Sequence, residues 1–328
     1  MSDSVDLQAD VCGIVFLDKP LGWTSRRAVN EVSRLFSRPG KKRIKAGHAG
    51  TLDPLATGML PILLGDATRF SEVGLLAEKS YRVSFDLSYQ TDTLDCEGAV
   101  TASFDEAEDV GLDQLQAVLA GFRGEIEQVP PVYSAIRIDG KRAHELARKG
   151  KSVDMKVRLV TIKKLELLSF KFPIVELGVV CSKGTYMRSL ARDIGAALAM
   201  GGCVTALKRV STGGWPEAMM VPMDDLTERK DVCLVGLGHW LRDFERLDLS
   251  GDQVKRFLHG QRIQLKSTTI ESAIKIDKQN VTEQAVTGQT VAVFADDAVI
   301  GTGDVKAGLR HMVLHPVRIL PTAQQRYL

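Results

Sequence analysis

Apolar positions recur with two different spacings along the chain, and together they predict strands mixed with amphipathic helices. Residues 11–18 form a short apolar run that stops at a Lys-Pro step, which is typical of a buried strand. Residues 79–89 alternate, so that Tyr81, Val83 and Phe85 share one face of a second strand. These two segments predict that strands begin in the first quarter of the chain.

Helical spacing dominates several other segments. Thr24 or Ser25 can cap a helix whose apolar positions repeat from 28 to 36. Further helices are expected at 66–76, 112–122, 143–149 and 185–200, the last one ended by a Gly-Gly pair. In the segment 112–122, the side chains expected to point inward are Leu112, Leu115, Val118 and Leu119.

The second half of the chain adds more strands. Segments 157–170 and 174–181 predict an antiparallel pair interrupted near a proline, and 204–210 can return as another strand. Because strands and helices do not alternate regularly, a mixed, mainly antiparallel α+β sheet with flanking helices fits better than a doubly wound fold. Beyond about residue 245, short strands flank an Asp-Asp turn. We therefore expect a large unit over 1–245 and a small, mostly β unit over 250–320.

Composition narrows the class of protein. The chain has 328 residues, of which 44% are hydrophobic and 26% charged, so a disordered, collagenous or coiled-coil protein is excluded. No apolar run approaches the roughly 18–20 residues of a membrane span, and the first ten residues carry no Lys or Arg, unlike a signal peptide. The five cysteines are scattered without a CxxC pair, which predicts neither a zinc site nor disulfides. We expect a cytoplasmic protein with reduced thiols.

The formal net charge of +2 hides strong segregation of charge. Residues 26–45 hold eight Lys or Arg and one Glu, and residues 137–158 hold eight Lys or Arg and three acids. Residues 86–113 hold nine acids and no base. Basic stretches on a nearly neutral protein indicate a polyanionic partner that touches only part of the surface. Charge alone favours the simpler interpretation, that these stretches are ordinary solvated faces.

One segment, residues 47–58 (GHAGTLDPLATG), concentrates candidate chemistry. Its three glycines let the backbone approach another group closely, and Pro54 biases Asp53 away from helical geometry. A loop thus presents a carboxylate, the imidazole of His48 and a hydroxyl. Taken alone, an aspartate before a proline, such as Asp53, is usually a turn residue or a helix cap. A lone histidine such as His48 usually has a structural role. The glycine spacing matches no nucleotide-binding loop.

The complete segment is far more specific than its parts, and it resembles the signature of the TruB family of bacterial tRNA pseudouridine-55 synthases. Four further blocks resemble that family in the same order along the chain: 79–83 (KSYRV), 91–95 (TDTLD), 132–142 (VYSA and GKR) and 181–190 (CSKGTYMRSL). The resemblance covers about residues 12–212. Beyond 245 it is weaker, in outline a PUA-like RNA-binding domain.

The resemblance implies a fold, an activity and a substrate. It implies a pseudouridine synthase catalytic domain over 1–245 and a PUA-like domain over 250–320. It implies isomerisation of uridine 55 in the TΨC stem-loop of tRNA after the base is flipped out of its loop. No cofactor and no metal are expected, nor an obligate protein partner or a membrane, and the family implies a monomer.

The resemblance also assigns the site residues. Asp53 matches the family's catalytic aspartate, acting as a nucleophile or through a glycal, and the residues leave this choice open. Arg188 matches the arginine that pairs with it, since a guanidinium binds a carboxylate through two hydrogen bonds. Tyr81 matches the active-site tyrosine, which stacks on uracil and assists proton movement. The expected substrate-binding residues are His48, Tyr186, Leu207, Asp95 and Lys183.

The basic stretches then become candidate RNA surfaces. Their phosphate contacts would make the affinity for tRNA strongly dependent on salt. The candidate phosphate-binding residues are Arg26, Arg27, Lys41, Lys42, Arg43, Lys45, Lys141, Arg142, Arg148 and Lys149.

Three other functions compete with this interpretation. A non-catalytic tRNA-binding or folding chaperone would share the basic surfaces, although the presence of Asp53, Tyr81 and Arg188 together argues against it. A related synthase could modify another RNA, within a guided complex. A hydrolase could use Asp53 as its nucleophile, but the sequence offers no second carboxylate or metal constellation beside it.

Overall fold

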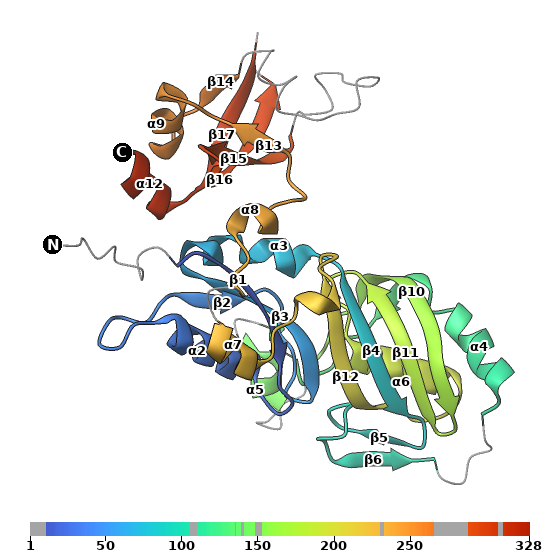
Figure 1. Cartoon of the computed structure of the whole chain (residues 1–328). Coiled ribbons are helices and arrows are strands. Elements are labelled where there is room, and N and C mark those ends of the chain that lie inside the picture. The colour runs from blue at the N-terminus through green and yellow to red at the C-terminus, as the bar shows by residue number, and fades with distance from the viewer. Residues whose placement is uncertain are drawn as a thin grey trace.

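The structure is a computed structural model with two sheets of different size (Figure 1). It describes residues 11–104, 110–134, 136–138, 141–147, 153–229, 233–265, 288–307 and 311–328. The larger sheet and its helices form the lower part of Figure 1, and the smaller sheet lies above them.

The larger sheet has eight strands in the order β1-β3-β12-β4-β11-β10-β7, with β2 paired to β3. These strands are β1 (Gly13–Lys19), β2 (Ala46–His48), β3 (Ala56–Leu64), β4 (Lys79–Asp86), β7 (Gly124–Gln128), β10 (Arg158–Lys171), β11 (Ile174–Cys181) and β12 (Cys203–Thr212). All pairs are antiparallel except β12 with β3. The predicted mixed, mainly antiparallel sheet is confirmed, including the β10–β11 pair.

Helices cover one face of this sheet because their apolar stripes match its buried side chains. These helices are α2 (Ser25–Phe36), α4 (Leu112–Ala120) and α6 (Met187–Ala197). Thr24 caps α2 by accepting a hydrogen bond from Arg27 N at 3.1 Å, as the sequence indicates. The short helices α5 (Ala143–Ala147) and α7 (Met223–Arg229) complete this unit.

The smaller sheet has five strands in the order β13-β15-β16-β17-β14. They are β13 (Arg246–Asp248), β14 (Ile263–Leu265), β15 (Thr290–Ala295), β16 (Ala298–Ala307) and β17 (Met312–Ile319), flanked by α9 (Asp252–Leu258) and α12 (Pro321–Tyr327). Between β15 and β16, Asp296 and Asp297 adopt φ of 45° and 60°, as a tight hairpin requires. The predicted small β unit and its Asp-Asp turn are confirmed.

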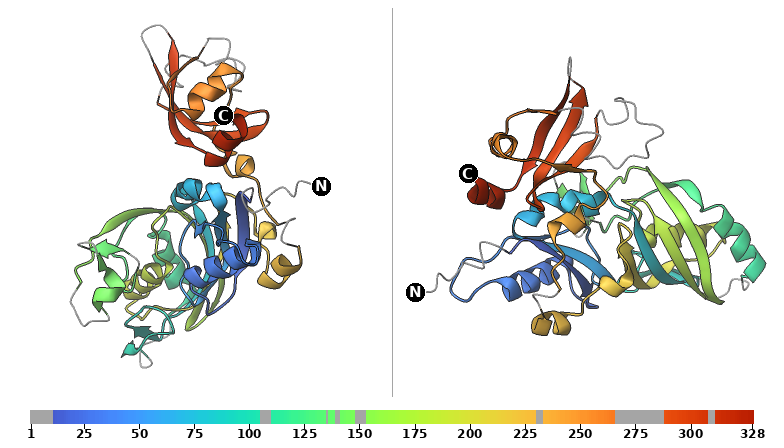
Figure 2. Two further views of the ribbon diagram at one scale, coloured as in Figure 1. Left: turned by 90° about the vertical axis from the view of Figure 1, so that its left-hand side faces the viewer. Right: turned by 45° about the horizontal axis from the view of Figure 1, so that its top comes forward.

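The two sheets share one apolar cluster, so the smaller unit packs directly on the larger one. Ile14 and Phe16 of β1 point away from the α2 side and join this cluster. Trp240, in α8 (Leu237–Trp240), stands between the units and donates to Phe70 O at 3.0 Å. Figure 2 shows α8 and α3 (Ser71–Leu76) at this junction from two further sides.

Two local expectations are corrected, and one hairpin has no counterpart among the predicted elements. Segment 66–76 is two elements, a 3₁₀ turn η1 (Gly65–Phe70) followed by α3, because Thr68 Oγ1 donates to Gly65 O and competes with α-helical pairing. The acidic stretch contains a small hairpin, β5 (Tyr89–Thr91) with β6 (Val100–Ser103). In α4, Leu115 and Leu119 are buried, but Leu112 in the first turn is 49% exposed.

Three short elements complete the description. Strands β8 (Arg137–Ile138) and β9 (Lys141–Arg142) form a two-stranded ladder, and η2 (Glu217–Met219) follows β12. Within the described part of the chain, no helix is both long enough and apolar enough to cross a bilayer. Part of the basic segment 137–158 lies outside the described residues, including Arg148 and Lys149.

Candidate active site

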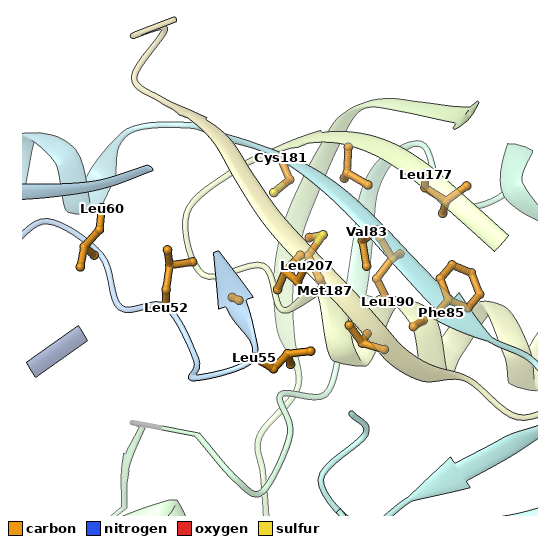
Figure 3. Close-up of a cluster of buried hydrophobic side chains, with 14 of the residues drawn as sticks. Leu52, Leu55, Leu60, Val83, Phe85, Leu177, Cys181, Met187, Leu190 and Leu207 are labelled. Carbon is orange, nitrogen blue, oxygen red and sulfur yellow. The ribbon is translucent and has the colours of Figure 1, made fainter. Parts of the chain in front are cut away.

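Asp53 lies in the loop between β2 and β3, and several hydrogen bonds fix this loop. The buried Ser25 hydroxyl donates to Leu52 O at 2.9 Å and accepts from Leu52 N at 2.8 Å, which clips the loop to the start of α2. Ala56 N donates to Asp53 O at 3.0 Å. The flanking Leu52 and Leu55 insert into the core, as Figure 3 shows. The Asp53 carboxylate is therefore presented by a rigid support.

Arg188 lies in the first turn of α6 and approaches Asp53 from inside the protein. Its Nη2 lies 2.8 Å from Asp53 Oδ2, and its Nη1 lies 3.4 Å from Asp95 Oδ2. The same guanidinium donates to Thr93 O at 2.8 Å and to Tyr133 O at 2.9 Å. Arg188 is only 4% exposed, so these four acceptors hold a buried charge in one orientation.

The turn that carries Asp95 has a left-handed residue at its centre. Leu94 has φ of 63°, a conformation that costs a non-glycine residue about 1–2 kcal/mol. Because the chain reverses there, the carbonyl of Thr93 and the carboxylate of Asp95 both reach Arg188. Asp95 Oδ1 also accepts from Thr93 Oγ1 at 2.6 Å and from Glu97 N at 3.2 Å. Asp95 thus belongs to the site through Arg188.

A cavity of about 300 Å³ opens beside this ion pair, a size suited to one small ring. Its lining includes Asp53, Tyr81, Tyr186, Arg188 and Leu207. These five side chains come from the loop, two strands and the start of α6. Among the described residues, the structure therefore brings together all three predicted catalytic residues and two of the predicted substrate-binding residues, Tyr186 and Leu207.

Tyr81 projects from β4 into this cavity and is half-buried. Burial raises the pKa of the Tyr81 hydroxyl, and the positive charge of nearby Arg209 opposes that rise. The hydroxyl is therefore protonated at neutral pH. Leu207, on the neighbouring strand β12, is 9% exposed and forms an apolar part of the wall.

Tyr186 precedes α6 and is positioned by a buried glutamine. Gln128 Oε1 accepts from Tyr186 N at 2.8 Å, and Gln128 Nε2 donates to Tyr186 O at 3.2 Å. Burial raises the pKa of Tyr186, while the neighbouring Ser134 side chain acts in the opposite direction. The double hydrogen bond from Gln128 fixes the backbone from which this ring projects.

His48 does not line the small cavity. It lines an adjoining cavity of about 1050 Å³, together with Arg26, Asp53, Asp95 and Arg188. Its Nδ1 is buried and has no hydrogen-bond partner among the described residues. Burial lowers the pKa of His48, and the charges of Arg209 and Arg26 lower it further, so the ring is neutral at pH 7. Asp53 and Arg188 line both cavities.

Lys183 is a predicted substrate-binding residue that does not line the small cavity. It is exposed in the turn between β11 and α6, and the small cavity is lined by its neighbours Ser182, Gly184 and Thr185. Within the described ranges, no three His, Cys, Asp or Glu side chains gather closely enough to hold a metal ion.

Sequence reasoning missed two buried cations beside the cavity. Lys79, 7% exposed, donates to the carbonyl oxygens of Gly74, Leu75 and Ala77 at 2.6–2.8 Å. Burial lowers the pKa of Lys79 to about 8. Arg209, 1% exposed, lies on the cavity-facing side of β12. A basic residue in an alternating strand is normally solvent-facing, so the local pattern contained no signal for either burial.

Comparison with known proteins assigns the chain to the same family that its motifs resemble. The family model "TruB family pseudouridylate synthase (N terminal domain)" matches residues 38–187, and "tRNA pseudouridylate synthase B C-terminal domain" matches residues 188–243. Proteins named tRNA pseudouridine synthase B are similar over most of their length. The one from Chromobacterium violaceum is 38% identical, covering 95% of this chain and 96% of that protein. The one from Burkholderia mallei is 40% identical, covering 94% and 97%.

Solved structures agree in fold at lower sequence identity. A chain of the "Structure of H/ACA RNP bound to a substrate RNA containing 2'-deoxyuridine" superposes with a TM-score of 0.67 at 22% identity, covering 96% of this chain and 86% of that one. A chain of a "Cbf5-Nop10-Gar1 Complex" gives 0.65 at 23% identity, covering 94% and 83%. The fold, the site loop and the matched segments agree: this chain belongs to the TruB family of pseudouridylate synthases.

Proposed function

We propose that this protein isomerises uridine to pseudouridine in tRNA, at position 55 of the TΨC loop. The relatives named above are tRNA pseudouridine synthases, and the motifs that relate the chain to them surround the cavity. One observation carries the proposal: the Asp53–Arg188 ion pair of 2.8 Å stands at the wall of a cavity that has room for one pyrimidine.

The reaction breaks one bond and forms another without loss of atoms other than an exchanged proton. The C1′–N1 bond breaks and its electron pair leaves with the uracil. Asp53 either attacks C1′ to give a glycosyl ester or removes the 2′ proton to give a glycal. The base turns, C5 bonds to C1′, and the C5 proton passes to solvent while N1 takes up a proton. Both routes require a free, oriented carboxylate oxygen.

We assign the other residues by their positions around Asp53. Arg188 orients the Asp53 carboxylate, and Asp95 orients Arg188 from the opposite side. The Tyr81 ring and hydroxyl face the base from β4, where the hydroxyl assists proton movement at C5. Tyr186 and Leu207 are the walls that hold the flipped base, and Lys183 contacts RNA at the rim. His48, in the larger cavity, occupies the space that the flipped nucleotide vacates.

The surface around the larger cavity is proposed to bind the stem-loop. Arg26 lines that cavity and is exposed, as is its neighbour Arg27. The exposed basic residues Lys41, Lys42, Arg43 and Lys45 extend this surface towards β2. In this proposal, residues 1–245 form the catalytic domain and 250–320 a PUA-like RNA-binding domain. We place the protein in the cytoplasm, where its tRNA substrate is found. It acts there as a monomer and without a cofactor.

The test is release of tritium from an unmodified tRNA transcript labelled at uridine C5. Wild type should release the label and Asp53→Asn should not, while both bind tRNA with similar, salt-dependent affinity. No release by wild type with tight binding retained would replace the proposal with the chaperone or with another RNA substrate. Release of tritium by Asp53→Asn as well would show that Asp53 is not the catalytic carboxylate. A second transcript with cytidine at position 55 locates the modified uridine.

A further inference from the structure

Arg209 is the largest fully buried side chain of the described protein, and two backbone carbonyls accept hydrogen bonds from its guanidinium. Its Nε donates to Met59 O at 2.6 Å and its Nη2 donates to Gly50 O at 3.1 Å. Among the described residues, no carboxylate oxygen lies within ion-pair distance of the Arg209 guanidinium. An arginine stays protonated in proteins, so this is a permanent, uncompensated positive charge.

Two glycines of segment 47–58 make room for Arg209, Gly50 for its guanidinium and Gly58 for its backbone. A Cβ on Gly50 would lie 3.3 Å from Arg209 Nη1, and a Cβ on Gly58 would lie 2.3 Å from Arg209 O. Gly50 and Gly58 have φ of 121° and 93°, which favour glycine. The close approach that the glycines of segment 47–58 indicate is thus an approach to Arg209. The loop that carries Asp53 is built around this charge.

The register of the sheet places Arg209 beside Tyr81. The two residues are directly opposite each other in the antiparallel β4–β12 pair, where opposed side chains are close neighbours. Both line the small cavity, together with Asp53. Arg209 therefore lies next to the part of the cavity where Tyr81 would face the base.

The two buried arginines of the site differ in how their charges are balanced. Arg188 faces two carboxylates, Asp53 and Asp95, so that group carries net negative charge. Arg209 donates to the carbonyls of Met59 and Gly50, and its positive charge also acts on the Tyr81 hydroxyl. The buried Lys79, with a pKa of about 8, adds a second cation on the same face. The cavity wall therefore carries the Asp53 carboxylate, held by Arg188, and two cations, Arg209 and Lys79, beside Tyr81.

This polarity matches a charge that develops in the proposed reaction. Whether Asp53 attacks C1′ or removes the 2′ proton, the electron pair of the C1′–N1 bond leaves with the uracil, which becomes an anion. We propose that Arg209 is an electrostatic positioning residue that stabilises this uracil anion from the wall of the cavity while the base turns. Preorganised charges in a closed, low-dielectric site act strongly on such developing charge. The inference rests on the proposed function.

A purely structural role for Arg209, holding Gly50 and Met59 in place, would also slow the enzyme when removed. The two roles differ in their dependence on the leaving group. A fluorine at C5 withdraws electrons and makes the departing uracil a more stable anion, which needs less help from the protein. Loss of a stabilising charge must therefore matter less for 5-fluorouridine than for uridine. Loss of loop geometry affects both substrates alike.

The experiment measures single-turnover loss of the N-linked nucleoside in a synthetic stem-loop with one uridine or one 5-fluorouridine at the target position. Arg209→Gln removes the charge and Arg209→Lys keeps it. Ser25→Ala is the matched control, because Ser25 clips the same loop at Leu52 without contributing charge. Thermal unfolding and stem-loop affinity are recorded for every variant.

We expect Arg209→Gln to lose about 10²–10³-fold in rate on uridine and clearly less on 5-fluorouridine. Arg209→Lys should recover most of the loss, and Ser25→Ala should lose the same factor on both substrates. Equal losses for Arg209→Gln on both substrates, or a lysine variant as slow as the glutamine variant, would overturn the inference. If wild type converted neither substrate, the proposed function itself would have failed.

A measurement on the unaltered protein covers the case in which Arg209→Gln does not fold. Wild type bound to a stem-loop that lacks the target base is titrated with free uracil and with 5-nitrouracil, an acidic analogue that is an anion at neutral pH. Tighter binding of 5-nitrouracil, lost when the pH is lowered until that analogue is neutral, supports a positive cavity. Equal binding of the two bases would contradict it.

Discussion

The Arg188 guanidinium meets the Asp53 carboxylate at 2.8 Å, inside a protein that leaves only 4% of the arginine exposed. Removing one partner of a buried ion pair leaves the other charge without compensation, which costs about 3–5 kcal/mol. We expect the stability cost of Arg188→Met to lie within this range, because Asp53, 37% exposed, can partly rehydrate, whereas Asp95, 7% exposed, cannot. Turnover, measured by tritium release, should collapse, while tRNA binding, measured by filter binding, should remain. Denaturant unfolding measures the loss of stability.

Arg192 provides the matched control for that change. It lies one turn further along α6 and pairs with Asp193 nearer the surface. Arg192→Met should cost about 0–1 kcal/mol and retain turnover. Near-normal turnover of Arg188→Met would exclude the orienting role of the ion pair.

The Tyr81 hydroxyl should contribute to the reaction beyond the ring itself. Tyr81→Phe keeps the ring and removes the proton-carrying group, so we expect tritium release to slow by about 10²-fold or more. Because burial raises the pKa of Tyr81, ionisation of this hydroxyl should not reduce wild-type activity below about pH 10. Tyr327→Phe, in the smaller unit, should leave the rate unchanged. Normal turnover of Tyr81→Phe would leave the ring with a stacking role alone.

Lys79 should make the stability of the protein rise with pH. Burial lowers its pKa from 10.5 to about 8, so between these values the unfolded chain holds a proton that the folded chain has released. The free energy of unfolding therefore gains up to about 3 kcal/mol from this group as pH rises through that window. Below pH 8, Lys79 adds no such increase to the free energy of unfolding.

The change that isolates this effect is Lys79→Met. The difference in unfolding free energy between wild type and Lys79→Met should shift in favour of wild type from pH 8 to pH 10. Lys164→Met, which removes an exposed lysine paired with Glu166, should leave the wild-type pH dependence intact. A constant difference between wild type and Lys79→Met across this range would contradict the prediction.

Gly74 should tolerate no side chain, because it is enclosed between the site loop and the junction of the two units. A Cβ there would lie 2.6 Å from Ala49 Cβ and 2.8 Å from the Trp240 ring. Gly74→Val should therefore destabilise the protein by about 1–3 kcal/mol through overpacking. Gly236→Ala is the control, since a Cβ at Gly236 would have no neighbour within 4 Å. Thermal unfolding is measured for both variants, and equal unfolding midpoints would contradict the prediction that Gly74 is enclosed.

Arg26 should contribute to the salt dependence of tRNA binding. It is exposed at the wall of the larger cavity, next to Asp53. Arg26→Ala should weaken binding and reduce the slope of log affinity against log salt by about 1. Lys164→Ala, on the distant strand β10, should leave the slope unchanged. An unaltered slope for Arg26→Ala would remove this residue from the proposed RNA surface.

Most elements of the fold could be predicted because they depend on local periodicity. A continuous apolar run marks β1, alternation marks β4, and helical spacing with a Thr24 cap marks α2. The predictions failed where neighbours outweighed the pattern. Thr68 favoured a 3₁₀ turn in η1, and the hairpin β5–β6 formed inside an acidic segment with little apolar signal.

The residues of the candidate site stand in short motifs, and the resemblance of those motifs to the TruB family predicted Asp53, Tyr81 and Arg188 as its catalytic residues. The sequence could not reveal that Asp95 shares Arg188 with Asp53, nor that His48 lies in a separate cavity. It gave no sign that Arg209 is buried. That burial follows from the register of β4 against β12 and from two glycines on β3 and its loop. Local sequence determines which side chains are present and which way they alternate, whereas the pairing of distant strands decides which charges meet in the interior.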